Sequence, residues 1–357
     1  MAQAPPDFLA DRTILVTGGT GSFGHRFTET VLLRHKPRKV IILSRDELKQ
    51  SEMRQAFGDH PALRFFLGDV RDRDRLLRAF HGVDVVVHAA ALKQVPAAEY
   101  NPWECVRTNI QGAQNVIDAA IDRGVKRVIA LSSDKAANPI NLYGATKLVS
   151  DKLFVAGNTY ASLGDTQLAV VRYGNVMGSR GSVIPLFKSL RETGRVPITD
   201  RRMTRFWITL EQAVGFVLRA LRRMRGGEIF VPKLPSMRLV DLAEAIAPGC
   251  ELDEVGIRPG EKLHEMMFTA EDARKAIEFD DHYVVQPAFP WWSDELAYEG
   301  GGRAVPDGFV YASDSNERWL SVAELRALVD GERAPSPALV IGASPAQHGA
   351  NGHAATL

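Results

Sequence analysis

Residues 13–24 read TILVTGGTGSFG, and this stretch decides the fold. Its first five residues are all β-branched or apolar, which is typical of a strand buried on both faces. The glycines at 18, 21 and 24 then stand three apart, and a helical pattern follows over residues 23–35. Glycines let backbone amides approach a pyrophosphate, and a helix start adds partial positive charge. A strand before the loop and a helix after it indicate dinucleotide binding rather than a simple turn.

The same rhythm continues through the first half of the chain. Short apolar runs, each expected to form a strand, occur at Thr13–Thr17, Lys39–Leu43, Leu63–Leu67, Asp84–His88, Arg127–Leu131 and Leu168–Arg172. Helix-like segments lie between them, near 23–35, 46–57, 72–80, 96–123 and 143–163. This order predicts an α/β fold with a doubly wound parallel sheet of the Rossmann type. Ligands of such a sheet bind at the carboxyl ends of the strands.

After about Gly178 the rhythm changes. Strand signals thin out, prolines punctuate the chain, and helical patterns recur near 183–193, 210–225 and 238–247. We therefore expect an NADP-binding Rossmann domain over residues 1–178, a smaller α/β substrate-binding lobe over 179–330 and a disordered tail over 331–357. Parts of the lobe are expected to return to the first domain.

Composition excludes several classes of protein. The 357 residues carry 44 Lys+Arg against 43 Asp+Glu, which argues against binding to nucleic acid by bulk charge. Two cysteines exclude a disulfide scaffold, and the sequence shows no cluster of residues with metal-ligand spacing. We see no signal peptide and no apolar run near the roughly 18 residues of a membrane span. We expect a cytoplasmic protein with no metal, nucleic acid or membrane partner.

The end of the second strand bears on the choice of cofactor. An NAD site usually carries an acidic residue there, but Ser44 and Arg45 take that place and Lys49 lies one turn further on. A hydroxyl and a guanidinium suit a 2′-phosphate, so NADP is favoured. Asp46 counts towards NAD, because a small shift in register would bring an acid to the strand tip. Asp69-Val70, after the third strand, meets the adenine edge or else begins a helix cap.

The fifth strand leads into LSSDKAANPINLYGATK, residues 131–147. Tyr143 and Lys147 are four residues apart at a helix start and therefore share a face. A nearby ammonium and the nicotinamide charge would favour tyrosinate and lower a pKa otherwise near 10. Such a tyrosine can remove a hydroxyl proton while hydride leaves for the cofactor.

These motifs together resemble a known family. The glycine loop, the Tyr143/Lys147 pair, Asn109 and the run RYGNV at 172–176 resemble the extended short-chain dehydrogenase/reductases, which act mostly on nucleotide sugars. Five blocks are similar to the inverting UDP-N-acetylglucosamine 4,6-dehydratases: AAALKQV at 89–95, SDKAANPINLYGATK at 133–147, GSRGSVIP at 178–185, TDRRMTRFW at 199–207 and RPGEKLHE at 258–265. The resemblance covers about residues 10–290, and more weakly extends to about 330.

The resemblance implies a reaction on UDP-N-acetylglucosamine. The product would be the C5-inverted UDP-2-acetamido-2,6-dideoxy-β-L-arabino-hex-4-ulose, as the first step of pseudaminic acid synthesis for flagellin or surface glycosylation. Residue chemistry fits: a neutral Lys135 can remove the C5 proton once C4 is a ketone, and a protonated Asp134 can donate to the departing C6 hydroxyl. A closed, desolvated pocket pushes each group towards its neutral form. By resemblance, Lys135 also reprotonates C5 on the opposite face.

The expected site residues fall into three sets. The catalytic set is Asp134, Lys135, Tyr143 and Lys147. The NADP-binding set is Gly18, Thr20, Gly21, Ser22, Phe23, Gly24, Ser44, Arg45, Asp46, Lys49, Asp69, Val70, Ala89, Ala90, Asn109, Tyr143, Lys147 and Val176. The substrate-binding set, carried over mainly by resemblance, is Lys93, Asn175, Arg205, Arg258 and Glu261. Two guanidiniums suit a UDP diphosphate, and a carboxylate suits a pair of ribose hydroxyls.

Two other functions remain open on the sequence alone. A nucleotide-sugar 4-epimerase would need Tyr143 and the cofactor but no Asp134–Lys135 pair, which would then be a loop salt bridge. A non-catalytic NADP-sensing protein would not need the intact Tyr143/Lys147 pair. We also expect a homo-oligomer, for which the helices near 96–123 and 143–163 are candidate interfaces, as in relatives.

Overall fold

The structure is a computed structural model that describes residues 7–161, 165–178, 183–289 and 301–331. The expected disordered tail, 331–357, lies outside these ranges apart from Gly331. Residues 179–182, part of one block quoted above, also lie outside them.

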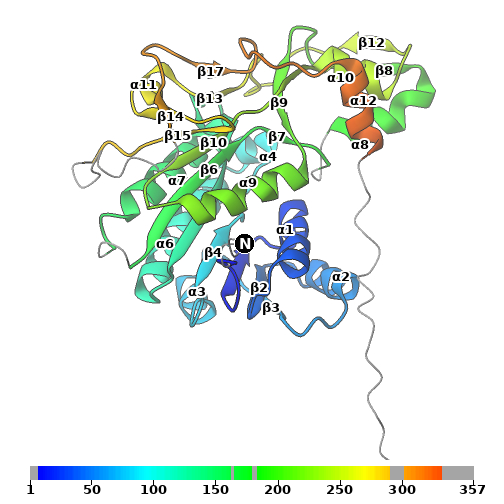
Figure 1. Ribbon diagram of the computed structural model, residues 1–357. Coiled ribbons are helices and arrows are strands. Elements are labelled where there is room, and N and C mark those ends of the chain that lie inside the picture. Colours follow the sequence, from blue (N-terminus) through cyan, green and yellow to red (C-terminus); the bar gives the residue numbers. More distant parts are fainter. Residues whose placement is uncertain (1–6, 162–164, 179–182, 290–300, 332–357) are drawn as a thin grey trace, which may run out of the picture.

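A ten-stranded sheet forms the centre of the molecule (Figure 1). In sheet order its strands are β16 (Arg303–Ala304), β14 (Ala276–Glu278), β15 (His282–Val285), β10 (Ile229–Pro232), β6 (Gln167–Tyr173), β5 (Arg127–Ser133), β4 (Val85–His88), β1 (Thr13–Thr17), β2 (Lys39–Ser44) and β3 (Leu63–Leu67). The strands from β6 to β3 are parallel. The doubly wound sheet predicted from the apolar runs is confirmed.

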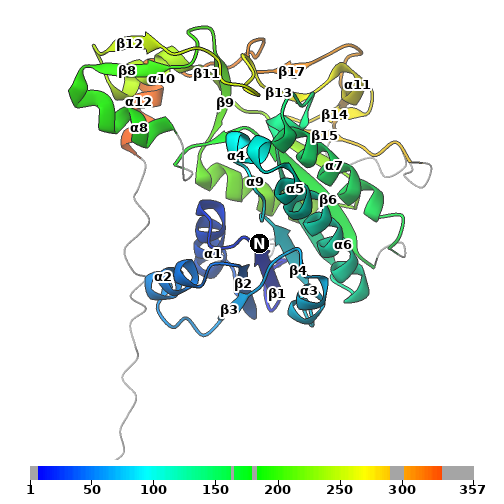
Figure 2. The same cartoon turned by 180° about the vertical axis from the view of Figure 1, so that it is seen from behind.

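Helices cover both faces of this sheet (Figures 1 and 2). One face carries α1 (Ser22–Arg34), α2 (Glu47–Phe57) and α9 (Leu210–Arg223). The other face carries α3 (Arg73–Ala79), α4 (Val95–Tyr100), α5 (Pro102–Val106), α6 (Gly112–Asp122) and α7 (Leu142–Gly157). The central strands are therefore shielded from water on both sides, which is why β1 is buried throughout and carries no alternating polar pattern.

The single helix expected over residues 96–123 is interrupted, which corrects the sequence prediction. Asn101 lies between α4 and α5 with φ −125° and ψ 63°, outside the helical region. The next residue is Pro102, whose ring disfavours helical backbone in the residue before it and suits the first position of a new helix. A π-helical turn, Arg107–Gln111, then joins α5 to α6 and carries Asn109.

The chain beyond Gly178 builds a second hydrophobic cluster. Its helices are α8 (Val183–Leu190), α10 (Leu239–Ile246) and α12 (Val322–Asp330), whose buried side chains pack together. Small sheets accompany these helices, in the orders β11 (Ser236–Arg238)–β9 (Thr204–Ile208)–β7 (Asn175–Val176) and β12 (Glu251–Glu254)–β8 (Arg195–Ile198). A third small sheet, β13 (Met266–Phe268)–β17 (Tyr311–Ala312), packs into the main core instead. Short helical turns occur at Asp134–Ala136 (η2), Arg191–Thr193 (η3) and Ala270–Ala273 (α11).

The second half also extends the main sheet. β10 pairs in parallel with β6, and β15, β14 and β16 continue the sheet in antiparallel fashion. Among the described residues, none of the helices combines the length and the apolar character that a membrane span requires.

Candidate active site

The glycine loop lies between the ends of three strands. Gly18 has a φ of 64°, in the left-handed region that favours glycine, and its amide donates to the Leu43 carbonyl at 2.8 Å. A Cβ on Gly18 would come within 2.8 Å of the Ala90 Cα, and a Cβ on Gly24 would overlap the backbone of Gly19. The loop therefore packs so closely against the ends of β2 and β4 that side chains have no room.

The start of α1 is open to an anion. Gly21 occupies the N-cap and offers no side chain to the first amides of this 13-residue helix. Those amides have no partner within the helix, and the helix dipole favours negative charge at this end. Thr20, Ser22 and Phe23 lie on the same turn. This cradle fits the pyrophosphate of a dinucleotide.

The tip of β2 distributes its polar groups in an informative way. The Ser44 side chain is buried and accepts from Gln50 Nε2 at 3.0 Å. Asp46 caps α2 by accepting from the Lys49 amide, and its Oδ2 lies 2.8 Å from Lys49 Nζ. Arg45 is half exposed and lies 3.6 Å from Asp69 Oδ2. Arg45 and Lys49 are thus the exposed cations at this tip, Arg45 beside Asp69 and Lys49 beside Asp46.

Asp69 and Val70 have local structural partners. Asp69 forms short hydrogen bonds to the Arg71 side chain, at 2.6 and 2.9 Å, and α3 is capped by Asp72 instead. The possible role of Asp69 as a helix cap is therefore wrong. Val70 is buried, and its carbonyl accepts from Asn115 at 2.9 Å.

Asn109 fastens the loop after β4 to the active-site helix. Its Oδ1 accepts from the Leu92 amide at 2.8 Å, and its Nδ2 donates to the Leu92 carbonyl at 2.9 Å and to Thr146 Oγ1 at 3.0 Å. Both polar atoms of the amide are engaged with protein. These contacts join the segment after β4 to α7.

Tyr143 and Lys147 lie on one buried face of α7, which begins after the N-cap Asn141. Lys147 Nζ donates to the Leu131 carbonyl at 2.7 Å, and burial lowers its pKa. Burial also raises the pKa of Tyr143 to about 12, outweighing the Lys135 ammonium and a hydrogen bond with Ser133. In the protein alone desolvation dominates, whereas the expected lowering of the tyrosine pKa also includes the charge of a bound nicotinamide.

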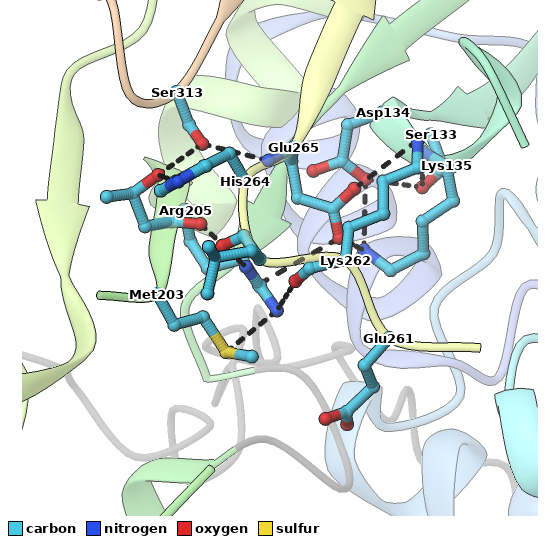
Figure 3. A network of polar contacts seen from close by, with 12 residues as sticks. Ser133, Asp134, Lys135, Met203, Arg205, Glu261, Lys262, His264, Glu265 and Ser313 are labelled. Carbon is cyan, nitrogen blue, oxygen red and sulfur yellow. Dashed lines mark hydrogen bonds and ion pairs between the residues drawn. The ribbon is translucent and has the colours of Figure 1, made fainter. Parts of the chain in front are cut away.

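Asp134 and Lys135 lie on the η2 turn, and a third charged residue joins them (Figure 3). Lys135 Nζ lies 3.0 Å from Asp134 Oδ1 and 3.0 Å from Glu265 Oε1. Ser133 Oγ donates to the same Asp134 oxygen at 2.9 Å. Both carboxylates are buried, at 1% and 2% exposed, and Asp134 Oδ2 has no hydrogen-bond partner.

This arrangement makes Lys135 an ammonium. Burial by itself favours the neutral amine, yet the carboxylates of Asp134 and Glu265 outweigh it and hold the pKa of Lys135 above its ordinary value. The neutral amine expected from a desolvated pocket is therefore not the state of the protein alone. To act as a base, Lys135 must first give up a proton.

The other expected substrate residues lie on three different segments of the chain. Asn175 Oδ1 is buried without a hydrogen-bond partner and is followed by Val176 in β7. Arg258 is exposed and lies 3.7 Å from Glu261 Oε1, while Glu261 Oε2 has no hydrogen-bond partner. Lys93 is exposed on the segment after β4. Unsatisfied buried acceptors such as those of Asn175 and Glu261 are suited to ligand hydroxyls.

Arg205 has different partners from the diphosphate expected by resemblance. Its guanidinium donates to the carbonyls of Thr204, Leu263 and Lys262 and to the sulfur of Met203, and its Nε lies 3.9 Å from Glu265 Oε1. A guanidinium has five N–H donors, and four of them are used in these hydrogen bonds, while Nε faces the Glu265 carboxylate. In this structure Arg205 therefore braces the segment around Glu265.

Sequence reasoning missed Glu265 and Lys262. Lys262 Nζ donates to the Ala137 carbonyl at 2.7 Å and lies 3.9 Å from Glu265 Oε2. Both residues belong to the RPGEKLHE block that carried the resemblance, but only Arg258 and Glu261 were selected from it. The signal was present: a charged residue at 265 adjoins the buried run Met267–Phe268.

The chain is similar to known proteins along most of its length. The family model described as polysaccharide biosynthesis protein matches residues 14–287. A Campylobacter jejuni protein named UDP-N-acetylglucosamine 4,6-dehydratase (inverting) is 54% identical over 326 residues, covering 89% of this chain and 97% of that protein. A Rickettsia canadensis protein named UDP-glucose 4-epimerase is 44% identical over 336 residues, covering 90% and 96%.

Solved structures agree on the fold. The X-ray structure of Pen from Bacillus thuringiensis covers 91% of this chain and all of its own, with a TM-score of 0.83 and 36% identity. The dTDP-glucose 4,6-dehydratase DesIV of Streptomyces venezuelae, solved with NAD and TYD bound, covers 70% of this chain and 86% of its own, with a TM-score of 0.63 and 26% identity. The chain therefore belongs to the polysaccharide biosynthesis protein family and, as the sequence blocks predicted, to the extended short-chain dehydrogenase/reductases related to inverting UDP-N-acetylglucosamine 4,6-dehydratases.

Proposed function

We propose that the protein catalyses the NADP-dependent dehydration of UDP-N-acetylglucosamine to the C5-inverted UDP-2-acetamido-2,6-dideoxy-β-L-arabino-hex-4-ulose. The observation that carries the proposal is the buried Asp134–Lys135 ion pair, which Ser133 links to Tyr143. Loss of water needs an acid and a base, and this pair can supply both. The name and 54% identity of the Campylobacter jejuni relative support the same reaction and the inversion.

The first step is oxidation at C4. The nicotinamide, when bound, takes the hydride from C4 and later returns it to C6. Tyr143 removes the O4 proton, and for this its hydroxyl must ionise despite a pKa of about 12 in the protein alone. Positive charge brought close to the ring favours that ionisation. Lys147, held by the Leu131 carbonyl, is the neighbouring group on the same helix face.

The second step uses the ion pair. A proton that passes from Lys135 Nζ to Asp134 across their 3.0 Å contact produces a neutral amine and a neutral acid. The amine then takes the C5 proton as the acid protonates the departing C6 hydroxyl, and the elimination of water regenerates the ammonium and the carboxylate. Reprotonation of C5 by Lys135 on the opposite face would give the inverted ring. This last transfer leaves Lys135 as a neutral amine, and the proton that Tyr143 removed from O4 must return to it to restore the ion pair.

NADP is the proposed cofactor because of the β2 tip. Asp46 is engaged as a helix cap and with Lys49, so its carboxylate is not free for ribose hydroxyls. Arg45 is an exposed cation at this tip, and its guanidinium suits a 2′-phosphate. The proposed NADP-binding residues are otherwise those expected from the sequence, with Asn109 acting through the backbone of Leu92.

The substrate is proposed to lie against the second lobe. Arg258 would meet the UDP diphosphate, Glu261 the ribose hydroxyls, and Asn175 and Lys93 the sugar. The orphaned oxygens of Asn175 and Glu261 support this placement, since each can accept from a hydroxyl.

A UDP-N-acetylhexosamine 4-epimerase is the second candidate, because Rickettsia relatives named UDP-glucose 4-epimerase are 44–45% identical to this chain. Epimerisation needs only the C4 step. Lys135→Ala decides between the two, because an epimerase would keep its turnover whereas the dehydratase would lose methyl product.

We also propose a cytoplasmic homo-oligomer that opens pseudaminic acid synthesis for flagellin or surface glycosylation. Two unpaired cysteines support a reducing compartment. The exposed aromatic side chains of Tyr100 and Trp103 beside α5 support an interface between copies. The family description supports a role in making surface polysaccharide.

Proton NMR of the protein with NADP and UDP-N-acetylglucosamine in deuterated water tests the reaction. A new C6 methyl signal, deuterium at C5 and the couplings of an L-arabino ring are expected. A methyl signal on a D-xylo ring would overturn the inversion but keep dehydration. UDP-N-acetylgalactosamine without a methyl signal would establish the epimerase instead.

A further inference from the structure

One buried carboxylate near the catalytic turn has no assigned role. Glu265 lies just before β13 and is 2% exposed. Its amide donates to Ser313 Oγ at 2.9 Å and its carbonyl accepts from the Ser313 amide at 2.8 Å, so its backbone is fixed. A buried carboxylate is costly to the fold unless cations compensate it. Such a residue in a catalytic pocket calls for a functional account.

Three cations surround the Glu265 carboxylate (Figure 3). Lys135 makes the hydrogen-bonded contact at 3.0 Å, whereas Arg205 and Lys262 lie 3.9 Å away. Arg205 and Lys262 also donate to backbone carbonyls, which holds them in place. The contact to Lys135 is therefore the short, directional one in a cationic surrounding.

Two further hydrogen bonds fix the segment against the catalytic turn. Asn141 Nδ2 donates to the Gly260 carbonyl at 2.7 Å, and Lys262 Nζ donates to the Ala137 carbonyl at the same distance. Asn141 is also the N-cap of α7. The position of Glu265 relative to Lys135 is thus set by the same contacts that join the proposed substrate segment to the catalytic helix.

We propose that Glu265 is a positioning residue for the proton transfers at C5, an inference that rests on the proposed dehydration. When Lys135 passes one proton to Asp134, the neutral amine keeps two N–H bonds, and the Glu265 carboxylate accepts one of them. The direction of the amine lone pair is then fixed. When the amine takes the C5 proton, the ammonium is again shared between the two carboxylates and is held ready to return a proton to C5.

Glu265→Gln tests this role by separating the two chemical steps. Single-turnover cofactor reduction measures C4 oxidation, and NMR in deuterated water measures C5 exchange and methyl product. Methyl formation should fall roughly 10- to 100-fold, because a small misplacement of a reacting group has effects of this size. C4 oxidation and KM should stay within about threefold, since Glu265 acts after that step. Glu278→Gln is the matched control, because Glu278 pairs with Lys233 at 2.7 Å in β14 and should change neither rate.

A pH profile distinguishes positioning from a purely structural role. Glu265→Gln removes one of the two carboxylates that face Lys135 and should therefore lower the pKa values of the Asp134–Lys135 pair. The pH at which the rate of methyl formation rises should then be lower by about one unit or more. The other groups facing the amine, Asp134, Arg205 and Lys262, are unchanged in the variant. Glu265→Asp keeps the charge, so methyl formation by this variant should rise at the wild-type pH, although its rate should be lower.

Three results would overturn the inference. One is Glu265→Gln with wild-type methyl formation and an unshifted pH dependence, and another is a loss of C4 oxidation in parallel with methyl formation. If melting curves show that the Gln variant does not fold, a fully active Glu265→Asp would be the third. A wild-type enzyme that gives no methyl product would refute the proposed function first, and the role of Glu265 with it.

Discussion

The active site holds two lysines, one buried and one partly buried, whose surroundings are opposite. Lys147, on α7, donates to the Leu131 carbonyl and has no ion-paired carboxylate among the described residues, and burial lowers its pKa. Lys135, on the η2 turn, lies between two buried carboxylates that raise its pKa. Burial alone therefore does not determine the charge of a lysine here. The anions within hydrogen-bond reach decide it, and they divide the site into an anion-poor side, where we propose that C4 is oxidised, and an anion-rich side, where we propose that C5 and C6 react.

The largest effect should come from removing each amine in turn. Lys147→Met should lower C4 oxidation by about 10²- to 10⁴-fold, because it disables the tyrosine that takes the O4 proton. Lys135→Met should lower methyl formation by a similar factor while C4 oxidation continues. Single-turnover cofactor reduction and product NMR, run side by side, check this. If both variants stall at the same step, the division of the site into two sides is wrong.

The same two variants should also differ in stability, with the larger loss of unfolding free energy for Lys135→Met. Lys135→Met leaves two buried carboxylates with one cation fewer, which should cost roughly 3 kcal/mol or more of unfolding free energy. Lys147→Met removes one hydrogen bond to a carbonyl, worth about 1 kcal/mol. Urea unfolding at neutral pH compares them. Equal losses would mean that Arg205 and Lys262 fully compensate the carboxylates.

Arg45, an exposed cation at the end of β2, tests whether exposed charge acts differently from buried charge. Arg45→Ala should weaken NADP binding about 10- to 100-fold through the lost charge-assisted hydrogen bonds, and should leave NAD binding nearly unchanged. Titration calorimetry with both cofactors measures the ratio. A parallel loss of affinity for NAD would place Arg45 away from the 2′-phosphate.

The smallest effect concerns pH. Because Lys147 has a folded-state pKa below the ordinary 10.5, the unfolded chain binds more protons between those two values. Wild-type stability should therefore rise with pH relative to Lys147→Met, by at most about 1.4 kcal/mol per pH unit, up to 10.5. Urea unfolding at several pH values below 10.5 gives the slope. Identical slopes for the two proteins would mean that Lys147 titrates normally.

The sheet could be predicted because its strands carry their own signal. Six parallel strands are short apolar runs, and residues 13–24 give the nucleotide loop a strand before it and a helix after it. The strands of the second half could not be predicted in the same way. Most are two to four residues long, too short to show a period, and they form through pairing with distant partners such as β10 with β6. The break at Asn101–Pro102 was readable and was missed.

The site residues also differ in how far local sequence predicts their arrangement. Tyr143 and Lys147 are four residues apart on one helix, so local spacing predicts their shared face. The contact between Lys135 and Glu265 joins residues far apart in sequence, and no periodicity links them. The charge on Lys135 depends on that contact. The sequence therefore indicated Lys135 as the candidate base at C5, but it did not indicate the charge of Lys135 in the folded protein.

The pairing of β10 with β6 has a consequence for how the chain is made. During synthesis β6 emerges well before Ile229–Pro232, so its outer edge carries unpaired backbone groups until the second half arrives. Exposed strand edges of nascent chains are sites of wrong pairing between molecules. The later strands thus protect the edge of the sheet as well as completing it. A chain whose synthesis stopped near residue 178 would leave the edge of β6 unpaired and prone to aggregation.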